Sequence, residues 1–303
     1  MRALLGPLLP ALNDIRYRVE YVFLRIIIGL VRLMPLDQAV RTSAFFWQLI
    51  APRLRRHKRA LENLAIAYPE KTPEEREAIA YAMWANLGRV MAETMQLDRI
   101  LADPSRITIK SQAFDRYADK VGPIVGVSLH MGNWELAIWP LAKSGKDPAA
   151  IYRKVNNPYV DQYLRAQRKA LYPGGLFAKG SAEESQRVVR IITDFVKSGG
   201  RLGIVSDLHD NAGLPVPFFG QPAKSVIAPA LIARRTGARV WMARCLRVGN
   251  ESRFVIDMKE LKVPRTANLG DDIRQATADI QKQFEAWIRE APEQWMWSNR
   301  RWS

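Results

Sequence analysis

The chain has 303 residues, 48% of them apolar, and its 46 Lys and Arg against 30 Asp and Glu give a net charge of +16 and a pI near 10.2. This composition excludes a disordered chain and favours anionic partners such as phospholipid headgroups, a phosphorylated lipid, an acidic protein or nucleic acid. A single cysteine, Cys245, excludes an intramolecular disulfide and fits a reducing, cytoplasm-facing location, and with only three histidines a metal centre is not expected.

The first predicted element is an amphipathic helix over residues 17–34. Arg18, Arg25 and Arg32 recur every seven residues, so on a helix they form a basic stripe beside an apolar one. Because the arginines interrupt the apolar run, its longest uncharged stretch is far below the roughly 18 residues of a membrane span. We therefore expect residues 1–36 to be a membrane-surface anchor whose arginines reach lipid phosphate. The alternative is an ordinary amphipathic helix packed on the protein's own core.

Further helices are expected before the sheet begins. A periodic, aromatic helix is predicted over residues 37–50, and a basic cluster opens the next one at residues 53–67. That cluster is either a solvated helix face or a phosphate-binding surface. Thr72 and Glu75 have the spacing of a capping box, which predicts a helix that runs from there to about residue 97.

From residue 107 onward, short apolar runs alternate with helical patterns. This predicts an α/β fold with a central, mostly parallel or mixed sheet flanked by helices. No internal repeat, long linker or phosphate-binding glycine fingerprint interrupts the pattern, so residues 37–303 are expected to form a single domain behind the N-terminal helical, membrane-associating segment. The predicted strands are residues 107–109, 124–129, 149–152, 202–205 and 240–246, and the clearest helices between them are residues 159–169 and 183–197.

The second predicted strand is followed by a possible catalytic pair. His130 lies at the carboxyl end of this strand, and Glu135 falls in the first turn of a helix predicted over residues 133–143. Ligands of open α/β sheets usually bind at that end of the strands. An imidazole can accept a proton from a hydroxyl, and a nearby carboxylate can orient the ring or help to hold the substrate. The alternative is a buried histidine beside a helix-start glutamate.

Several blocks of residues carry a family resemblance in their order and spacing. With them, the chain resembles the lipid A biosynthesis acyltransferases, the late acyltransferases of Gram-negative bacteria, within the wider lysophospholipid and glycerol-phosphate acyltransferase superfamily. The resemblance spans nearly the whole chain. The histidine motif at residues 130–135 alone indicates only the superfamily, whereas the blocks at residues 216–220 and 292–302 point to this branch. The blocks are His130-Met131-Gly132-Asn133-Trp134-Glu135, Tyr152-Arg153 with Asn157-Pro158 and Arg168, Asp207, Val216-Pro217-Phe218-Phe219-Gly220, and Pro292-Glu293-Gln294-Trp295-Met296-Trp297 with Arg300-Arg301-Trp302.

The resemblance implies transfer of a fatty acyl group from acyl carrier protein to the hydroxyl of a 3-hydroxyacyl chain on a lipid A precursor, at the cytoplasmic face of the bacterial inner membrane. His130 is expected to act as general base and Glu135 to orient it or the substrate. Cys245 lies outside every matched block, so direct attack of the hydroxyl on the thioester is simpler than a ping-pong route. The expected partners are acyl carrier protein, the phosphorylated lipid acceptor and the anionic membrane surface, with no cofactor, metal or nucleic acid.

The remaining candidate residues are supporting ones. Arg168 matches the family's functional arginine and is expected to bind substrate phosphate or to support the site, with Arg153 and Asn133 as secondary candidates. Asp207 ends the strand of residues 202–206 and is expected to hold the geometry of the histidine or of an arginine. His209 stands where family members often carry an aspartate. His209 is expected either to bind substrate or simply to be exposed in a loop.

The closing segment is aromatic and basic. Trp295 and Trp297 are expected to pack against the sheet, and Arg300 and Arg301 are expected at the surface. Two other classes of function stay open. An acyltransferase for another phosphorylated glycerolipid or glycolipid would keep the same pair of residues. A nucleic-acid-binding protein would fit the charge, although the sequence has no recognisable reading module.

Overall fold

The computed structural model describes residues 8–110, 122–145, 147–179 and 182–302, so residues 1–7 of the predicted anchoring segment lie outside the described residues. The described α-helices are α2 Leu8–Leu33, α3 Leu36–Ile50, α4 Arg55–Ala67, α5 Pro73–Thr94, α6 Leu97–Leu101, α8 Trp139–Lys143, α9 Pro158–Arg168, α10 Ala182–Lys197, α11 Ala228–Thr236 and α12 Leu269–Glu290. Short 3₁₀ helices are η1 Ala51–Arg53, η2 Pro104–Arg106, η3 Trp134–Ile138 and η4 Pro292–Gln294.

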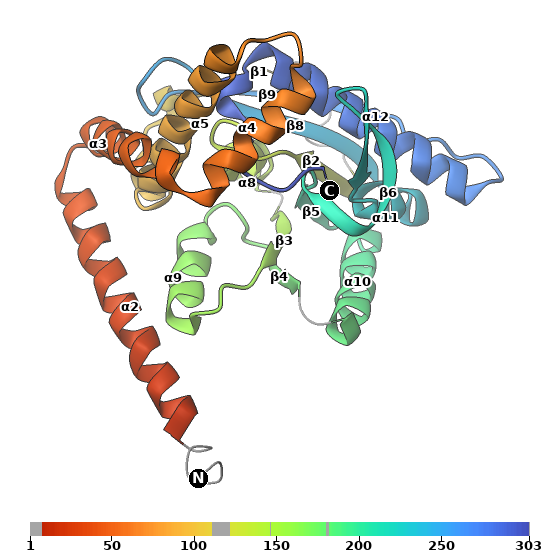
Figure 1. Cartoon of the computed structure of the whole chain (residues 1–303). Coiled ribbons are helices and arrows are strands. Elements are labelled where there is room, and N and C mark those ends of the chain that lie inside the picture. Colours follow the sequence, from red (N-terminus) through yellow and green to blue (C-terminus); the bar gives the residue numbers. More distant parts are fainter. Residues whose placement is uncertain (1–7, 111–121, 146, 180–181, 303) are drawn as a thin grey trace.

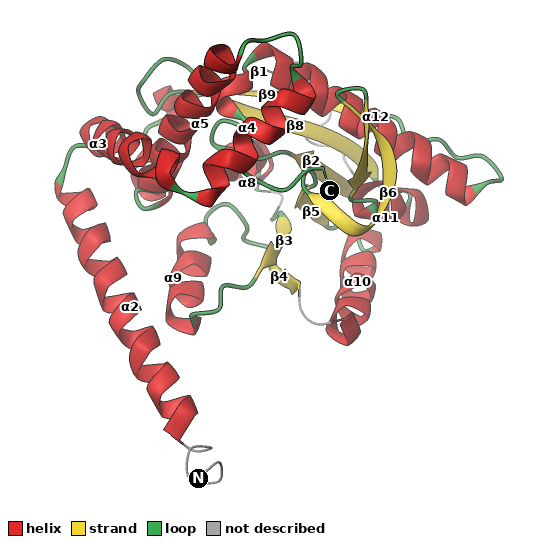
Figure 2. Cartoon of the chain, in the orientation of Figure 1, coloured by secondary structure: helices red, strands yellow, loops and turns green. Residues whose placement is uncertain are grey.

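The strands form one large sheet and a separate hairpin (Figures 1 and 2). The strands are β1 Ile107–Lys110, β2 Ile124–Ser128, β3 Ala149–Arg153, β4 Gly175–Lys179, β5 Arg201–Val205, β6 His209–Phe218, β7 Gln221–Ser225, β8 Arg239–Arg247 and β9 Phe254–Leu261. Seven of them pair in the order β1-β9-β8-β2-β5-β3-β4, and only the β8–β9 pair is antiparallel. The predicted α/β class with a mostly parallel sheet is therefore confirmed.

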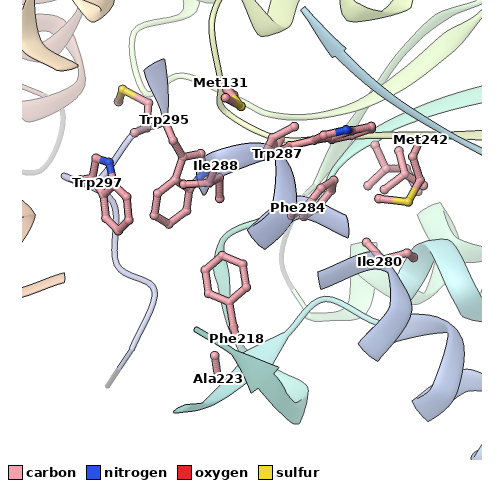
Figure 3. Close-up of a cluster of buried hydrophobic side chains, with 14 of the residues drawn as sticks. Met131, Phe218, Ala223, Met242, Ile280, Phe284, Trp287, Ile288, Trp295 and Trp297 are labelled. Carbon is pink, nitrogen blue, oxygen red and sulfur yellow. The ribbon is translucent and has the colours of Figure 1, made fainter. Parts of the chain in front are cut away.

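Strands β2 and β5 lie next to each other in the middle of the sheet, and apolar side chains pack against both of its faces there. Val125 and Val127 pack in one cluster with Ile192 of α10 and Ala233 of α11, so these helices cover one face. On the other face, the Cδ1 atom of Ile138 lies over the two central strands. The same large cluster extends to the closing segment and α12, where Figure 3 shows aromatic side chains packed beside Phe218.

Several strands were not predicted, and for the β6–β7 hairpin the sequence explains why. The β6–β7 hairpin is rich in Gly, Pro and polar residues, which reads as a loop. Those residues are tolerated because the hairpin is a two-stranded ribbon in which each strand is an edge. Its turn takes Phe219 and Gly220 to φ values of 50° and 72°, a conformation that suits glycine at the second position. Strands β4 and β9 were also missed.

Two predicted helices differ from the observed ones. The capping box of Thr72 and Glu75 is confirmed, but α5 ends at Thr94 and a separate short helix follows. The helix predicted over residues 133–143 begins instead as the 3₁₀ helix η3 and continues as α8. Pro140, near the start of α8, has no N–H to donate to the carbonyl of residue 136, so an uninterrupted α-helix cannot form there.

Helix α2 projects from the rest of the chain beside α9 (Figure 1). The three arginines of its basic stripe contact neighbouring residues of the protein, although Arg18 and Arg25 also remain exposed to solvent. The Arg32 guanidinium donates to Asp98 at 2.7 Å, and Arg18 and Arg25 lie over the rings of Tyr159 and Tyr163. The apolar side chains point the other way and are exposed, namely Leu12, Ile15, Val19, Val22, Phe23, Ile26, Leu30 and Leu33.

Candidate active site

The two central parallel strands bring a histidine and an aspartate together. His130 lies two residues beyond the end of β2, and Asp207 lies two residues beyond the end of β5. Because β2 and β5 are hydrogen-bonded neighbours in parallel register, both residues reach the same edge of the sheet. His130 Nδ1 is 2.8 Å from Asp207 Oδ1, and the backbone N–H of His130 donates to Asp207 Oδ2 at 2.8 Å.

The Asp207 contact selects one form of the imidazole. Since the carboxylate can only accept, Nδ1 carries a proton and donates it, which leaves Nε2 as the basic nitrogen. The His130 side chain is 21% exposed, whereas that of Asp207 is only 1% exposed. Nε2 is therefore the part of the pair that is suited to take a proton from a substrate.

The charges of this pair reinforce each other. Burial by itself lowers the pKa of His130, but the neighbouring Asp207 carboxylate outweighs it and raises this pKa above its ordinary value of 6.5. Burial likewise opposes ionisation of Asp207, and the interactions with His130 outweigh it and hold the Asp207 pKa below 3.8. The indole N–H of Trp295 also donates to Asp207 Oδ2 at 2.7 Å. The pair is thus built to hold a negative carboxylate next to the imidazole.

Glu135 and Arg168 form a second pair. Arg168 Nε donates to Glu135 Oε2 at 2.8 Å, and Nη2 donates to Oε1 of the same carboxylate. The Glu135 side chain is 8% exposed and that of Arg168 is 23% exposed. Sequence analysis expected Glu135 to orient the histidine or the substrate. In the structure Asp207 contacts the imidazole, and the Glu135 carboxylate binds Arg168. The Glu135 carboxylate raises the pKa of Arg168, although burial opposes this.

The other predicted site residues lie in different surroundings. Arg153 is exposed at the end of β3, and His209 opens β6 with Nε2 at 3.0 Å from Asn211 Oδ1. Asn133 lies in the loop between His130 and Glu135 and is fully buried, so its side chain is not accessible to a substrate. The Trp295 and Trp297 side chains are buried as predicted.

The prediction for Arg301 is wrong, whereas Arg300 is exposed as expected. Arg301 is 1% exposed and lies over the ring of Phe218. Its Nη2 atom donates to Ser225 Oγ and to Gln281 Oε1. Burial lowers the Arg301 pKa to about 10. The chain end folds back over the β6–β7 hairpin, and this long-range packing has no local signal in the sequence.

A buried polar network holds the loop between His130 and Glu135, and sequence analysis missed it. Asn133 Nδ2 donates to Glu93 Oε2 at 2.9 Å, and Arg247 binds the same Glu93 carboxylate. The Glu93 and Arg247 side chains are only 0% and 3% exposed. A sequence signal did exist, because Glu93 is a carboxylate among the apolar residues of its helix and Arg247 ends the apolar run of β8.

The same loop is pressed directly onto β8. Gly132 has a φ of 56°, and a Cβ atom at this position would lie 1.8 Å from the carbonyl oxygen of Cys245. Glycine is therefore required here both by the backbone conformation and by the lack of space. The backbone N–H of Asn133 donates to the Cys245 carbonyl, and that of Met296 donates to the His130 carbonyl. The closing segment and β8 thus fix the loop from both sides.

The arrangement places a histidine–aspartate pair near a carboxylate–guanidinium pair. In the part of the chain that the structure describes, no group of three or more His, Cys, Asp or Glu side chains is placed to hold a metal ion. Cys245 is fully buried, and burial raises its pKa far above the ordinary value, so this thiol is not available as a nucleophile. Together the fold and the site define an α/β protein with a histidine–aspartate pair at the carboxyl edge of its sheet.

A comparison with known families gives this class its identity. The chain belongs to the bacterial lipid A biosynthesis acyltransferases, whose family model matches residues 10–303. The predicted family is thereby confirmed, and the protein is an acyltransferase of lipid A biosynthesis. A search of curated proteins found no match.

Proposed function

We propose that the protein transfers a fatty acyl group from acyl carrier protein to the hydroxyl of a 3-hydroxyacyl chain on a lipid A precursor, with His130 as the general base. The observation that carries this proposal is the His130–Asp207 contact, which leaves Nε2 basic at the edge of the sheet. A neutral hydroxyl is a weak nucleophile, so a base that takes its proton during attack accelerates the reaction.

The proposed reaction has two steps. His130 Nε2 takes the hydroxyl proton as the oxygen attacks the thioester carbonyl carbon, forming the new C–O bond. The C–S bond then breaks, and the leaving thiolate takes the proton from the imidazolium. Asp207 stabilises the imidazolium between these steps. Because the Cys245 thiol is buried, no acyl-enzyme intermediate is proposed.

Arg168 is proposed to support the site and to bind acceptor phosphate. A guanidinium has five N–H groups, and the Glu135 carboxylate accepts from only two of its nitrogens, so the same arginine can serve both partners. Glu135 is then the residue that fixes where this positive charge sits. The general excess of basic residues suits the other proposed partners, which are acyl carrier protein and the anionic surface of the inner membrane.

The function is tested with labelled acyl groups on acyl carrier protein and a tetra-acylated lipid A precursor in detergent micelles. We expect the wild-type protein to give a product that carries one more acyl group, seen by mass spectrometry. A parallel series offers other phosphorylated glycerolipids and glycolipids as acceptors. Transfer to one of those acceptors but not to the lipid A precursor contradicts the proposed acceptor and leaves the acyl-transfer chemistry intact.

We further propose that residues 1–36 attach the enzyme to the cytoplasmic face of the bacterial inner membrane. None of the helices in the described residues combines the length and apolar character needed to cross a membrane. The exposed apolar face of α2 supports attachment at the surface, because a row of large apolar side chains in water is unfavourable and gains free energy on entering lipid.

Removing this apolar face is expected to release the protein from lipid. Replacing Val22, Phe23 and Ile26 together by serine should weaken binding to anionic phospholipid vesicles about tenfold or more, because each side chain loses apolar area that lipid would bury. Vesicle flotation measures this directly. The control replaces the exposed Val189 and Ile191 of α10 by serine and should leave flotation unchanged. Equal flotation of both variants would contradict the proposed anchor.

A further inference from the structure

A tryptophan near the end of the chain donates to the candidate catalytic pair, and the proposed reaction gives it no part. The Asp207 carboxylate accepts two hydrogen bonds from His130, from the imidazole Nδ1 to Oδ1 and from the backbone N–H to Oδ2, both at 2.8 Å. A third comes from the indole Nε1 of Trp295 to Oδ2 at 2.7 Å. Trp295 is therefore a donor to Asp207 that comes from outside the pair.

Packing holds the indole N–H in this position. Trp295 is buried, and its ring centroid lies 4.6 Å from that of Trp297 and 5.8 Å from that of Phe218, in both cases edge to face (Figure 3). Such arrangements are favourable for aromatic pairs. A buried indole N–H without an acceptor is unfavourable, so the bond to Asp207 also satisfies Trp295. The carboxylate is thus bound by a donor that is fixed in place.

The same segment also binds the loop that carries the histidine. The backbone N–H of Met296 donates to the His130 carbonyl at 3.0 Å, and Met131 forms an antiparallel bridge with Trp295. The closing segment therefore contacts both members of the pair. It binds the histidine loop through backbone groups and Asp207 through the indole.

The third donor changes how strongly Asp207 acts on the imidazole. The indole N–H stabilises the negative charge on Oδ2 whether or not His130 is protonated. Trp295 therefore takes up part of the carboxylate charge, and less of this charge is left to stabilise the imidazolium. The terminal torsion of an aspartate side chain is soft, so the indole also limits rotation of the carboxylate about that bond. Both effects adjust the base without contact to a substrate.

We propose that Trp295 is a positioning residue of the acyl transfer. Its indole N–H holds the Asp207 carboxylate toward the imidazole and, by sharing the carboxylate charge, lets His130 act as a base at lower pH than Asp207 alone would allow. The inference rests on the proposed function, because Trp295 acts through the proposed base. Since Trp295 is buried, it acts on Asp207 and not on a substrate.

Other charged groups among the described residues also act on the pair. Glu135 adds to the rise in the pKa of His130 that Asp207 causes against the lowering effect of burial. The Arg301 guanidinium is buried, and burial lowers its pKa to about 10 while the Asp207 charge works against this lowering. Glu135 and Arg301 stay unchanged in every variant below, so a difference between the variants reports on the indole.

Two matched variants test the proposal. Trp295→Phe keeps an aromatic ring and removes the N–H that binds Asp207. Trp297→Phe is the control, because Trp297 is buried in the same segment and its indole Nε1 donates at 2.7 Å to the Pro292 carbonyl. The acyl-transfer assay gives kcat and KM as functions of pH, and thermal unfolding verifies that each variant is folded. Should Trp295→Phe not fold, benzothienylalanine in place of Trp295 keeps the two-ring shape and replaces the N–H by sulfur.

We expect the acidic limb of kcat/KM to move to higher pH by about 0.5 to 1 pH unit in Trp295→Phe, the shift that loss of one hydrogen bond produces. The maximal kcat should fall about threefold to tenfold, because the carboxylate is held less firmly, and the KM for the acceptor should stay within about twofold. Trp297→Phe should keep the wild-type limb. A limb that stays in place, moves to lower pH, or moves equally in both variants overturns the proposal.

A measurement without substrate separates this inference from the proposed function. In protein labelled with ¹⁵N-histidine, NMR follows the protonation of each imidazole, and the spectrum of His130→Ala identifies the signals of His130. A His130 midpoint at higher pH in Trp295→Phe, with the wild-type midpoint in Trp297→Phe, supports the role of Trp295 even if no acyl group is transferred. In that case only the proposed reaction fails. Equal midpoints in all three proteins overturn this role even if acyl transfer is observed.

Discussion

We expect His130→Ala to lower kcat about 10²- to 10⁴-fold in the acyl-transfer assay, the range that a positioned general base contributes. The physical reason is that the variant removes the Nε2 atom that the Asp207 contact leaves basic. The KM for the acceptor should change much less, because the base acts mainly in the transition state. Steady-state kinetics at saturating acyl carrier protein give both values.

The control for this prediction is His209→Ala. His209 interacts with Asn211 on the same strand, and its removal should leave kcat within about twofold of wild type. Thermal unfolding of both variants shows whether they are folded. A folded His130→Ala protein with wild-type kcat contradicts the proposed base, whereas a large loss in His209→Ala would place the base elsewhere.

The pH dependence gives an independent check on the same pair. Because Asp207 raises the pKa of His130 above 6.5, the base is neutral only at higher pH, and kcat/KM should rise with pH through that raised value. Asp207→Asn removes the negative charge, so the acidic limb should move to lower pH as the maximal rate falls. An acidic limb that stays in place in this variant would show that another group controls it.

The same shifts predict how stability depends on pH. The raised pKa of His130 contributes stability that is fully present below pH 6.5 and is lost as the pH rises through the raised value. The lowered pKa of Asp207 contributes stability that is present above pH 3.8 and is lost as the pH falls through the lowered value. The pair therefore stabilises the fold most between these two limits.

We expect Arg247→Met to lower the free energy of unfolding by about 3–5 kcal/mol, the cost typical of removing one partner of a buried ion pair. The variant leaves the Glu93 carboxylate without its bidentate partner in a site that is closed to solvent. Ser252 and Asn133 would still donate to it, but neither compensates its charge. Urea unfolding followed by circular dichroism measures the loss.

Arg253→Met is the matched control at the other side of the same β8–β9 turn. Arg253 pairs with Glu251 in solvent, with both side chains about half exposed, so its removal should cost no more than about 1 kcal/mol. Replacing Glu93 and Arg247 together by apolar residues should cost less than the sum of the single changes, because no uncompensated charge remains. Equal losses for Arg247→Met and Arg253→Met would contradict the buried network.

Local sequence patterns were sufficient to predict β2 and the start of α5 near the site. The apolar run of residues 124–129 and the capping box at Thr72 predicted β2 and the start of α5, because strand and helix formation depend on nearby residues. The sequence also placed His130 at the carboxyl end of its strand. Local patterns did not predict the β6–β7 hairpin, because Pro and Gly disfavour strand formation locally. Only the pairing of β6 with β7 stabilises these residues as strands.

The sequence by itself thus determined the α/β class, the family and the position of the histidine along the chain. Only the tertiary structure decided which groups meet. Asp207 reaches His130 across 77 residues because β5 pairs with β2, and Glu135 binds Arg168 instead because the chain enters a 3₁₀ helix after the glycine loop. Strand order and burial result from packing of the whole chain, so neighbouring residues do not encode them.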